Sequence, residues 1–213
     1  MTKTRDKKEA GMQKERYVKF RAEWDNTPVE ADHLLMKHIN RVRSELIARG
    51  WLGSLPDGTG FGNISLRPDE TGKFLITGSK TGHLKQLGAQ HISSVEKTDI
   101  TNNRLFCRGL TIASSEALSH AACYRSNPHI NAVIHIHSRE LWLNYLNKIP
   151  TTDQNAVFGT PAIALSIARI VKKRIANYGL IVMGGHPDGL IAYGKNLKTA
   201  VTILIRAHND IRR

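Results

Sequence analysis

Two histidines separated by a single residue, His135 and His137, end an apolar segment that begins at Ile130. In an extended strand alternate residues share a face, so both imidazoles point to the side that Val133 also faces. The apolar residues of the opposite face are expected to lie in the core: Ala132, Ile134 and Ile136. Two imidazoles on one side of a rigid strand match the geometry that a metal ion needs, although two ligands do not complete a site.

An acidic residue that could act with these histidines is Glu116, in the sequence Ser-Ser-Glu at 114–116. His120 follows four residues later and would share its side of a helix. A carboxylate beside a metal ion serves either as a ligand or as a general base whose pKa the ion tunes. The alternative is that Glu116 is simply a favourable acid in the first turn of a helix, and that His120 is a hydrogen-bonded structural histidine.

A third metal ligand could come from His186, which lies in a glycine-rich turn over 184–189 between two apolar runs. Catalytic zinc sites typically use three protein ligands and keep one position open. A solvated turn histidine is the alternative, and the ten histidines of the chain leave other candidates open.

Two polar, glycine-rich turns could bind an anion: 62–65 (Gly-Asn-Ile-Ser) and 77–82 (Thr-Gly-Ser-Lys-Thr-Gly). Backbone N–H groups and hydroxyls in such turns can surround an anion, and Lys80 could add positive charge. Ser114 and Ser115, at a helix start, could join them. Taken singly, each is an ordinary turn.

The elements that must position these residues are a mixture of helices and strands, in which strands outnumber helices. Helices are predicted from a Thr27 cap with Pro28 in the first position to Gly50, from Ser114 or Ser115 to Ser126, from Arg139 to Asn147, from Pro161 to about Asn177, and after Asn196. Strands are predicted at 61–66, 73–77, 92–95, 104–107, up to His137, 180–183 and 190–193. This mixture predicts a single α/β domain with a mixed sheet and helices on both faces.

Composition limits the class of protein. The chain has 213 residues and a net charge of +13, without an apolar run of membrane-spanning length. Residues 1–25 are predicted to be a basic tail, without the features of a secretory signal, and residues 26–213 the domain. Cys107 and Cys123 are expected to be free thiols in the cytoplasm. The charge favours anionic partners or a solvated basic surface, and nucleic acid is not expected because the basic clusters lack interleaved aromatic residues.

Four motifs occur in a specific order: Gly-Asn-Ile-Ser at 62–65, Ile-Thr-Gly-Ser at 76–79, Ser-Ser-Glu-x-x-x-His at 114–120, and Val-Ile-His-Ile-His-Ser at 133–138. Together with His186 they resemble the class II aldolase/adducin family, over residues 30 to 210. The pairing of Ser-Ser-Glu with His-x-His is the specific part of the resemblance.

The resemblance implies a three-layer α/β/α domain with a central, largely antiparallel mixed sheet. It implies a divalent metal, zinc first with manganese or cobalt as alternatives, bound by His135, His137 and His186, and it places Glu116 as the acid/base. It also implies a homotetramer with sites between neighbouring subunits. The residues that it places around the phosphate and hydroxyls of a substrate are Asn63, Ser65, Thr77, Ser79, Ser114 and Ser115.

The function expected from this resemblance is that of a metal-dependent aldolase, a lyase that cleaves or forms a C–C bond next to the carbonyl of a small phosphorylated keto-sugar. The metal would stabilise an enediolate, and Glu116 would move the proton. The alternatives are a sugar-phosphate epimerase or dehydratase of the same family, or a non-catalytic, adducin-like binding module. The sequence between His137 and His186 is shorter than in sugar-phosphate aldolases, and His186 is followed by Pro-Asp-Gly rather than by glycine.

Overall fold

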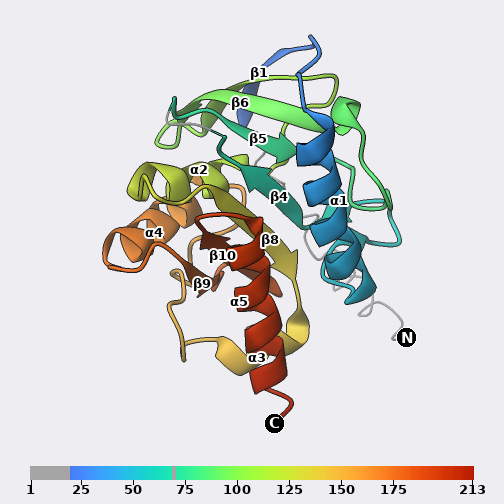
Figure 1. Ribbon diagram of the computed structural model, residues 1–213. Coiled ribbons are helices and arrows are strands. Elements are labelled where there is room, and N and C mark those ends of the chain that lie inside the picture. Colours follow the sequence, from blue (N-terminus) through green and yellow to red (C-terminus); the bar gives the residue numbers. More distant parts are fainter. Residues whose placement is uncertain (1–19, 69–70) are drawn as a thin grey trace, which may run out of the picture.

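The computed structural model describes residues 20–68 and 71–213 (Figure 1). Most of the predicted tail, residues 1–19, lies outside the described residues. Residues 21–25 were expected in the tail but form an edge strand, β1, which pairs in parallel with β7. The sheet therefore begins before the expected domain boundary at residue 26.

An eight-stranded sheet forms the centre of the molecule, with the strand order β1-β7-β6-β5-β4-β8-β10-β9. The strands are β1 (Arg21–Asp25), β4 (Asn63–Leu66), β5 (Phe74–Thr77), β6 (Ile92–Asp99), β7 (Arg104–Arg108), β8 (Ala132–His137), β9 (Gly179–Val182) and β10 (Gly189–Gly194). A separate ribbon pairs β2 (Gly53–Ser54) with β3 (Gly60–Phe61). All neighbours in the main sheet are antiparallel except β1 and β7, which confirms the predicted mixed, largely antiparallel sheet.

Helices cover both faces of this sheet (Figure 1). They are α1 (His33–Ala48), α2 (Ala117–Ser126), α3 (Arg139–Tyr145), α4 (Pro161–Lys172) and α5 (Leu197–Asp210), with a short 3-10 helix η1 (Ala89–His91). One apolar cluster joins α2 and α4 to one face, and a second joins α1 and α5 to the other. The predicted three-layer α/β/α arrangement is confirmed.

Strand β8 lies between β4 and β10 and contributes to both clusters. Its predicted core residues Ala132, Ile134 and Ile136 are fully buried against the α1 and α5 layer. Val133 is buried on the opposite face, among residues of α2 and α4. His135 shares the face of Val133, so this histidine is buried inside the protein rather than exposed at its surface.

The predicted start of the first helix is wrong. The cap is Asp32, whose Oδ1 accepts a hydrogen bond of 2.7 Å from the Leu35 amide, and not Thr27. The intervening chain runs from β1 to α1 without helical structure and buries Val29, a tertiary contact that the local Thr-Pro-Val-Glu pattern does not reveal. The predicted end is confirmed: Gly50 follows the helix with a φ of 70°, which suits glycine.

Two other helix boundaries differ from the prediction. Helix α2 begins at Ala117 with Glu116 as the cap residue, and the Ser114 hydroxyl is bonded to Asn63 rather than to the helix. Helix α4 ends at Lys172 and not near Asn177. The caps predicted at Thr160 and Asn196 are confirmed, and Asn196 Oδ1 accepts from the Thr199 amide at 2.9 Å.

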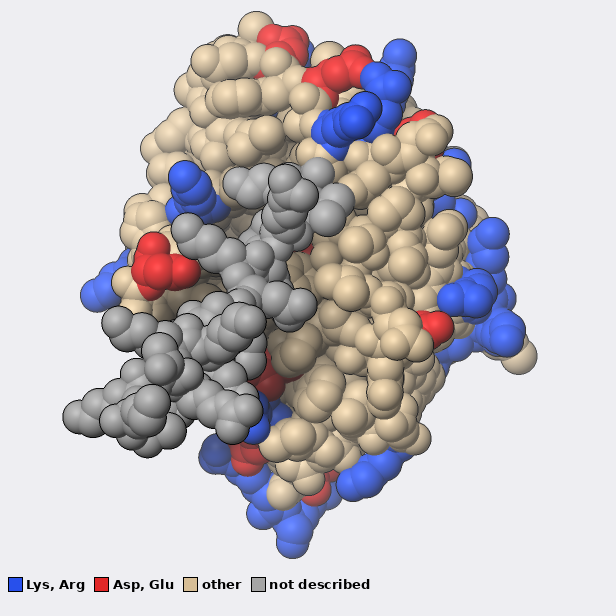
Figure 2. All heavy atoms as spheres, turned by 180° about the vertical axis from the view of Figure 1, so that it is seen from behind, with Lys and Arg blue, Asp and Glu red and all other residues tan. Residues whose placement is uncertain are grey.

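On the face drawn in Figure 2, Lys and Arg lie mostly toward the margins, and the part of the middle that the grey residues leave visible is largely uncharged. Over residues 20–68 and 71–213, no helix has the length and apolar character needed to cross a membrane.

Candidate metal centre

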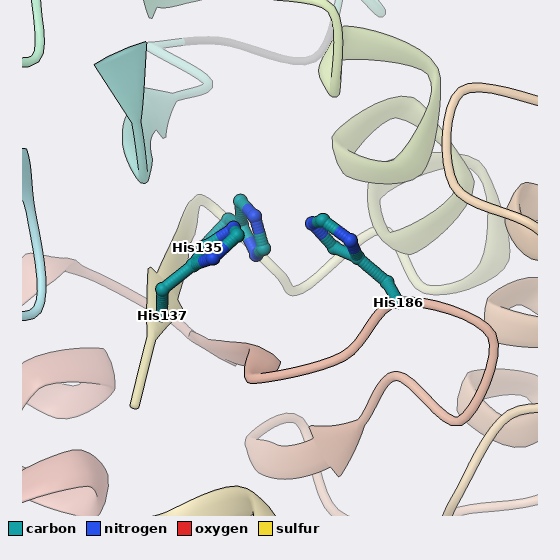
Figure 3. Close-up of side chains that lie close together, drawn as sticks. All are labelled: His135, His137 and His186. Atoms are coloured by element: carbon teal, nitrogen blue, oxygen red, sulfur yellow. The ribbon is translucent and has the colours of Figure 1, made fainter. Parts of the chain in front are cut away.

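Three histidines converge at one end of the sheet (Figure 3). His135 and His137 project from β8, and His186 comes from the turn between β9 and β10. The possible ligand atoms of the three rings all lie within 4.8 Å of one another. Ring centroids are 5.0 Å apart for His135 and His137, 5.2 Å for His135 and His186, and 4.7 Å for His137 and His186. The structure thus brings the predicted third histidine to the strand pair.

The turn that carries His186 is fixed by its own hydrogen bonds and by close packing. The His186 amide donates to Met183 O at 3.1 Å, and the Gly189 amide donates to His186 O at 2.9 Å. A Cβ on Gly185 would overlap Ala156 O, so only glycine allows this approach. The third histidine therefore depends on the loop that contains Ala156.

Two aromatic rings contact the histidines, and no sequence pattern indicated either. Phe158 lies 4.5 Å from the His186 ring, and Phe61 lies 5.3 Å from the His137 ring, both measured between ring centroids. Aromatic residues in glycine-rich segments are indistinguishable from ordinary core residues without the fold. Both rings limit the space beside the imidazoles.

The electrostatic environment keeps the imidazoles neutral. Burial, together with repulsion between neighbouring rings, lowers the pKa of His135, His137 and His186 to about 3. His135 Nδ1 lies 3.1 Å from Leu190 O. A carbonyl only accepts, so Nδ1 carries the hydrogen and Nε2 keeps its lone pair. Neutral imidazoles with free lone pairs at this spacing fit a divalent metal ion, and the cluster is consistent with such a site.

Glu116 is buried beside this cluster, with 5% of its surface exposed. The Ser119 hydroxyl donates to Glu116 Oε2 at 2.7 Å, which orients the carboxyl group. Burial has the largest effect on the pKa of His135 and lowers it, whereas Glu116 acts in the opposite direction as a nearby negative charge. The predicted acid/base thus lies close enough to His135 to influence it.

Asn63 links the histidines to the serine-rich turn. It is the registered partner of His135 across β4 and β8, and its Nδ2 donates to Ser114 Oγ at 2.9 Å. Its Oδ1 is buried without a hydrogen-bond partner among the residues that the structure describes. Gly78 forms an antiparallel bridge with Ala113, so the turn at 77–82 lies next to the segment that contains Ser114. Ser79 and Ser115 are both partly buried in these segments.

Two of the predicted substrate-binding hydroxyls are used inside the fold. Ser65 Oγ lies 2.6 Å from His120 Nδ1 and 2.7 Å from the Tyr124 hydroxyl, between β4 and α2. Thr77 Oγ1 accepts from the Ile64 amide at 3.2 Å. Each of the two residues is 1% exposed. The structural alternative for His120 is supported, because it joins α2 to β4.

Comparison with known proteins places the chain in a family. Residues 46–210 match the family described as class II aldolase and adducin N-terminal domain, and the chain belongs to it. Over 119 residues it is 30% identical to 3-oxo-tetronate 4-phosphate decarboxylase of Haemophilus influenzae, covering 56% of this chain and 51% of that protein. The chain therefore matches about half the length of this curated relative.

Solved structures show the same fold. YgbL of Klebsiella pneumoniae has a TM-score of 0.62 at 21% identity, covering 86% of this chain and 89% of that chain. L-fuculose-1-phosphate aldolase of Thermus thermophilus has a TM-score of 0.59 at 20% identity, covering 82% of this chain and 89% of that chain. At these identities the likeness concerns the fold alone.

Proposed function

We propose that the chain is a metal-dependent lyase that breaks a C–C bond next to the carbonyl of a small phosphorylated substrate. The observation that carries the proposal is the cluster of His135, His137 and His186 with the buried carboxyl group of Glu116 beside it. A purely structural binding module has no need for three neutral imidazoles and an acid in one place. Membership of the class II aldolase and adducin family supports the same class of reaction.

The three histidines would hold the metal, and zinc is the first candidate because it is commonly bound by imidazole in catalytic sites with an open position. When bound, a divalent ion would supply Lewis-acid stabilisation of the negative charge that develops on a carbonyl oxygen. The buried surroundings of His135 and the Leu190 carbonyl fix the ligand that is set deepest in the sheet.

Glu116 would move the proton. In retro-aldol cleavage it would take the proton from the hydroxyl on the carbon that leaves as an aldehyde or ketone, and would return a proton to the other carbon. Ser119 holds one carboxylate oxygen, which leaves the other free for this transfer. Ser79, Ser114, Ser115 and Asn63 would bind the phosphate or hydroxyl groups, while Ser65 and Thr77 would support them from inside the sheet.

Decarboxylation is a second candidate, because a relative at 30% identity is named a 3-oxo-tetronate 4-phosphate decarboxylase. A 3-oxo acid loses CO₂ when the electrons of the C–C bond move toward its carbonyl, and one proton then replaces the carboxylate on carbon. No base is needed to start this step, so Glu116 would act only as the acid. Aldol cleavage, by contrast, requires Glu116 first as the base that takes the hydroxyl proton and then as the acid that returns a proton to carbon.

The test is to supply the purified full chain with divalent metal and with a panel of phosphorylated ketoses and 3-oxo acids, and to follow products by NMR and CO₂ release. We expect metal-dependent loss of a C–C bond, abolished by H135A and retained by H38A, a change at an exposed histidine on α1. An epimer or dehydrated product would identify the corresponding alternative reaction. Absence of bound metal and of any turnover with zinc, manganese or cobalt would contradict the proposal.

We also propose, from the family resemblance, a homotetramer in the cytoplasm with residues 1–25 as an appended basic segment whose last residues join the sheet. Light scattering on the purified chain measures the assembly directly. A monomer at micromolar concentration would contradict a stable tetramer.

A further inference from the structure

Helix α1 carries a buried cation that the proposed chemistry does not use. Arg43 is 0% exposed and lies on the apolar face of the helix with Ile39 and Leu46. Burial lowers its pKa to about 10, so the guanidinium stays charged near neutral pH. Among residues 20–68 and 71–213, no carboxylate forms an ion pair with it. An arginine among the apolar residues of a predicted helix face is a sequence signal for such a buried cation, and it was not used to predict the site.

The Arg43 guanidinium is bonded instead to backbone carbonyls of one segment. Its Nη2 lies 2.5 Å from Thr81 O, 2.8 Å from Gly82 O and 2.7 Å from Leu84 O, and its Nε donates to Leu84 O at 3.0 Å. A buried charge is costly unless it is hydrogen-bonded. Since these carbonyls provide that bonding only in their present arrangement, the arginine and the segment fix one another.

The same segment contains the strained part of the glycine-rich turn. Lys80 has a φ of 61°, a left-handed conformation that is unfavourable for a residue with a side chain. Thr81 Oγ1 donates to Gly78 O at 2.8 Å across the turn. A Cβ on Gly82 would overlap Gly53 O, so this backbone is held against β2 on its other side. Arg43 bonds the carbonyls of Thr81 and Gly82, which directly follow Lys80.

This turn lies against the candidate site. The Ser79 amide donates to Ile112 O at 2.8 Å, and Gly78 bridges Ala113, which precedes Ser114. The Lys80 Cα lies 3.6 Å from where a Cβ of Gly60 would be, one residue before Phe61, whose ring contacts His137. The turn is therefore packed against both the segment that precedes Ser114 and the strand that carries Phe61.

We propose that Arg43 is a positioning residue that holds the turn at 78–82 in an anion-binding shape, with Lys80 and the nearby serines meeting a phosphate-type dianion. The proposal rests on the proposed function only in its choice of anion. It assigns to Arg43 a role in binding the charged end of the substrate rather than in metal binding or bond cleavage.

The test is titration of the metal-loaded full chain with inorganic phosphate by calorimetry, with hydrogen exchange of residues 78–84 measured in parallel. We expect R43M to weaken phosphate binding at least about tenfold, the equivalent of one lost hydrogen bond to a charged group, and to increase exchange in this segment. Metal content should be unchanged. R43K, which keeps the charge but reaches fewer carbonyls, should recover part of the affinity and serves if R43M does not fold.

Two control variants separate positioning from charge and from general stability. R41M removes the same charge from an exposed position on α1, and L46A removes a buried side chain of the same helix that can offer the turn no hydrogen bond. Both should bind phosphate as the wild type does. Wild-type affinity in both R43M and R43K, an equal loss in L46A, or no phosphate binding by the wild type would overturn the proposal. Arg43-dependent phosphate binding without lyase activity would support it and count against the proposed function alone.

Discussion

Asn63 and His135 are registered partners on adjacent antiparallel strands, and their side chains share the face that α2 covers. Directly opposed residues in such a pair have Cβ atoms roughly 5 Å apart. Asn63 also holds Ser114, while His135 belongs to the histidine cluster. This one registered residue pair therefore sets the distance between the proposed metal and the segment that contains Ser114.

Removing one histidine at a time should show how much the two strand ligands and the turn ligand each contribute to metal affinity. H135A and H137A leave only one strand ligand and should abolish metal binding at micromolar metal. H186A keeps both strand ligands and should weaken zinc binding by more than about 100-fold, beyond the loss typical of residues that only support a ligand. Equilibrium dialysis with metal analysis measures this, with H38A as the matched control. Equal affinity in H186A and the wild type would exclude His186 from the site.

Replacing Glu116 with glutamine should separate metal binding from proton transfer. E116Q should retain bound metal and lose about 10²–10⁴-fold in turnover if the reaction is an aldol cleavage. S119A, which removes only the hydrogen bond to Oε2, should reduce turnover by less than E116Q. Steady-state kinetics with parallel metal analysis checks both variants. Undiminished turnover of E116Q would remove Glu116 from the mechanism.

A methyl group at Gly185 should displace the third histidine. The added Cβ would meet Ala156 O, and overpacking of this kind costs about 1–3 kcal/mol of stability. G185A should therefore lower both the free energy of unfolding and the metal affinity. G179A is the control on β9, where the added Cβ would lie 2.6 Å from the Tyr193 hydroxyl. It should lower the free energy of unfolding and leave the metal affinity unchanged. Urea unfolding and metal titration of the two variants test this, and full metal affinity in G185A would contradict it.

Acid should destabilise the metal-free protein before the carboxylates titrate. The folded-state pKa of buried His120 is lowered to about 3 by burial, against an ordinary value near 6.5, and the three clustered histidines share this direction. Between these values the unfolded chain binds more protons, so the free energy of unfolding falls as pH decreases, by up to about 1.4 kcal/mol per pH unit for each histidine. Urea unfolding between pH 7 and pH 4 measures the slope. A flat profile across that range would refute the prediction, and H120N should reduce the slope.

Patterns within single elements predicted most of the fold. Alternation in β8 identified both its core face and its histidine face, and the caps at Thr160 and Asn196 marked true helix starts. The start of α1 was missed because the chain before Asp32 buries Val29 without forming a helix, which the local Thr-Pro-Val-Glu pattern does not reveal. The strand at 21–25 was missed because its partner β7 lies about eighty residues away along the chain.

The site residues that lie close together in the sequence could be predicted from their spacing. The residues that only the fold brings together could not. His135 and His137 are two residues apart, so strand geometry alone placed them together. The contacts of Phe61, Phe158 and Arg43 depend on the ribbon β2–β3, on the loop before α4 and on the turn after β5. Ser65 and Thr77 share motifs with Asn63 and Ser79, yet strand pleating and pairing bury their hydroxyls in internal hydrogen bonds.

The division of the histidines between a central strand and a hairpin turn has a consequence for how such a site can diversify. The turn over 183–188 is a short connection that lies outside the registered residue pairs of β9 with β10 and of β10 with β8. A change of sequence there, matched in the neighbouring loop at 152–158, could exchange the third donor for a carboxylate or a thiolate and retune metal preference. The turn thus supplies a third ligand that can vary in sequence, while the central strand β8 keeps the other two ligands, His135 and His137, in place.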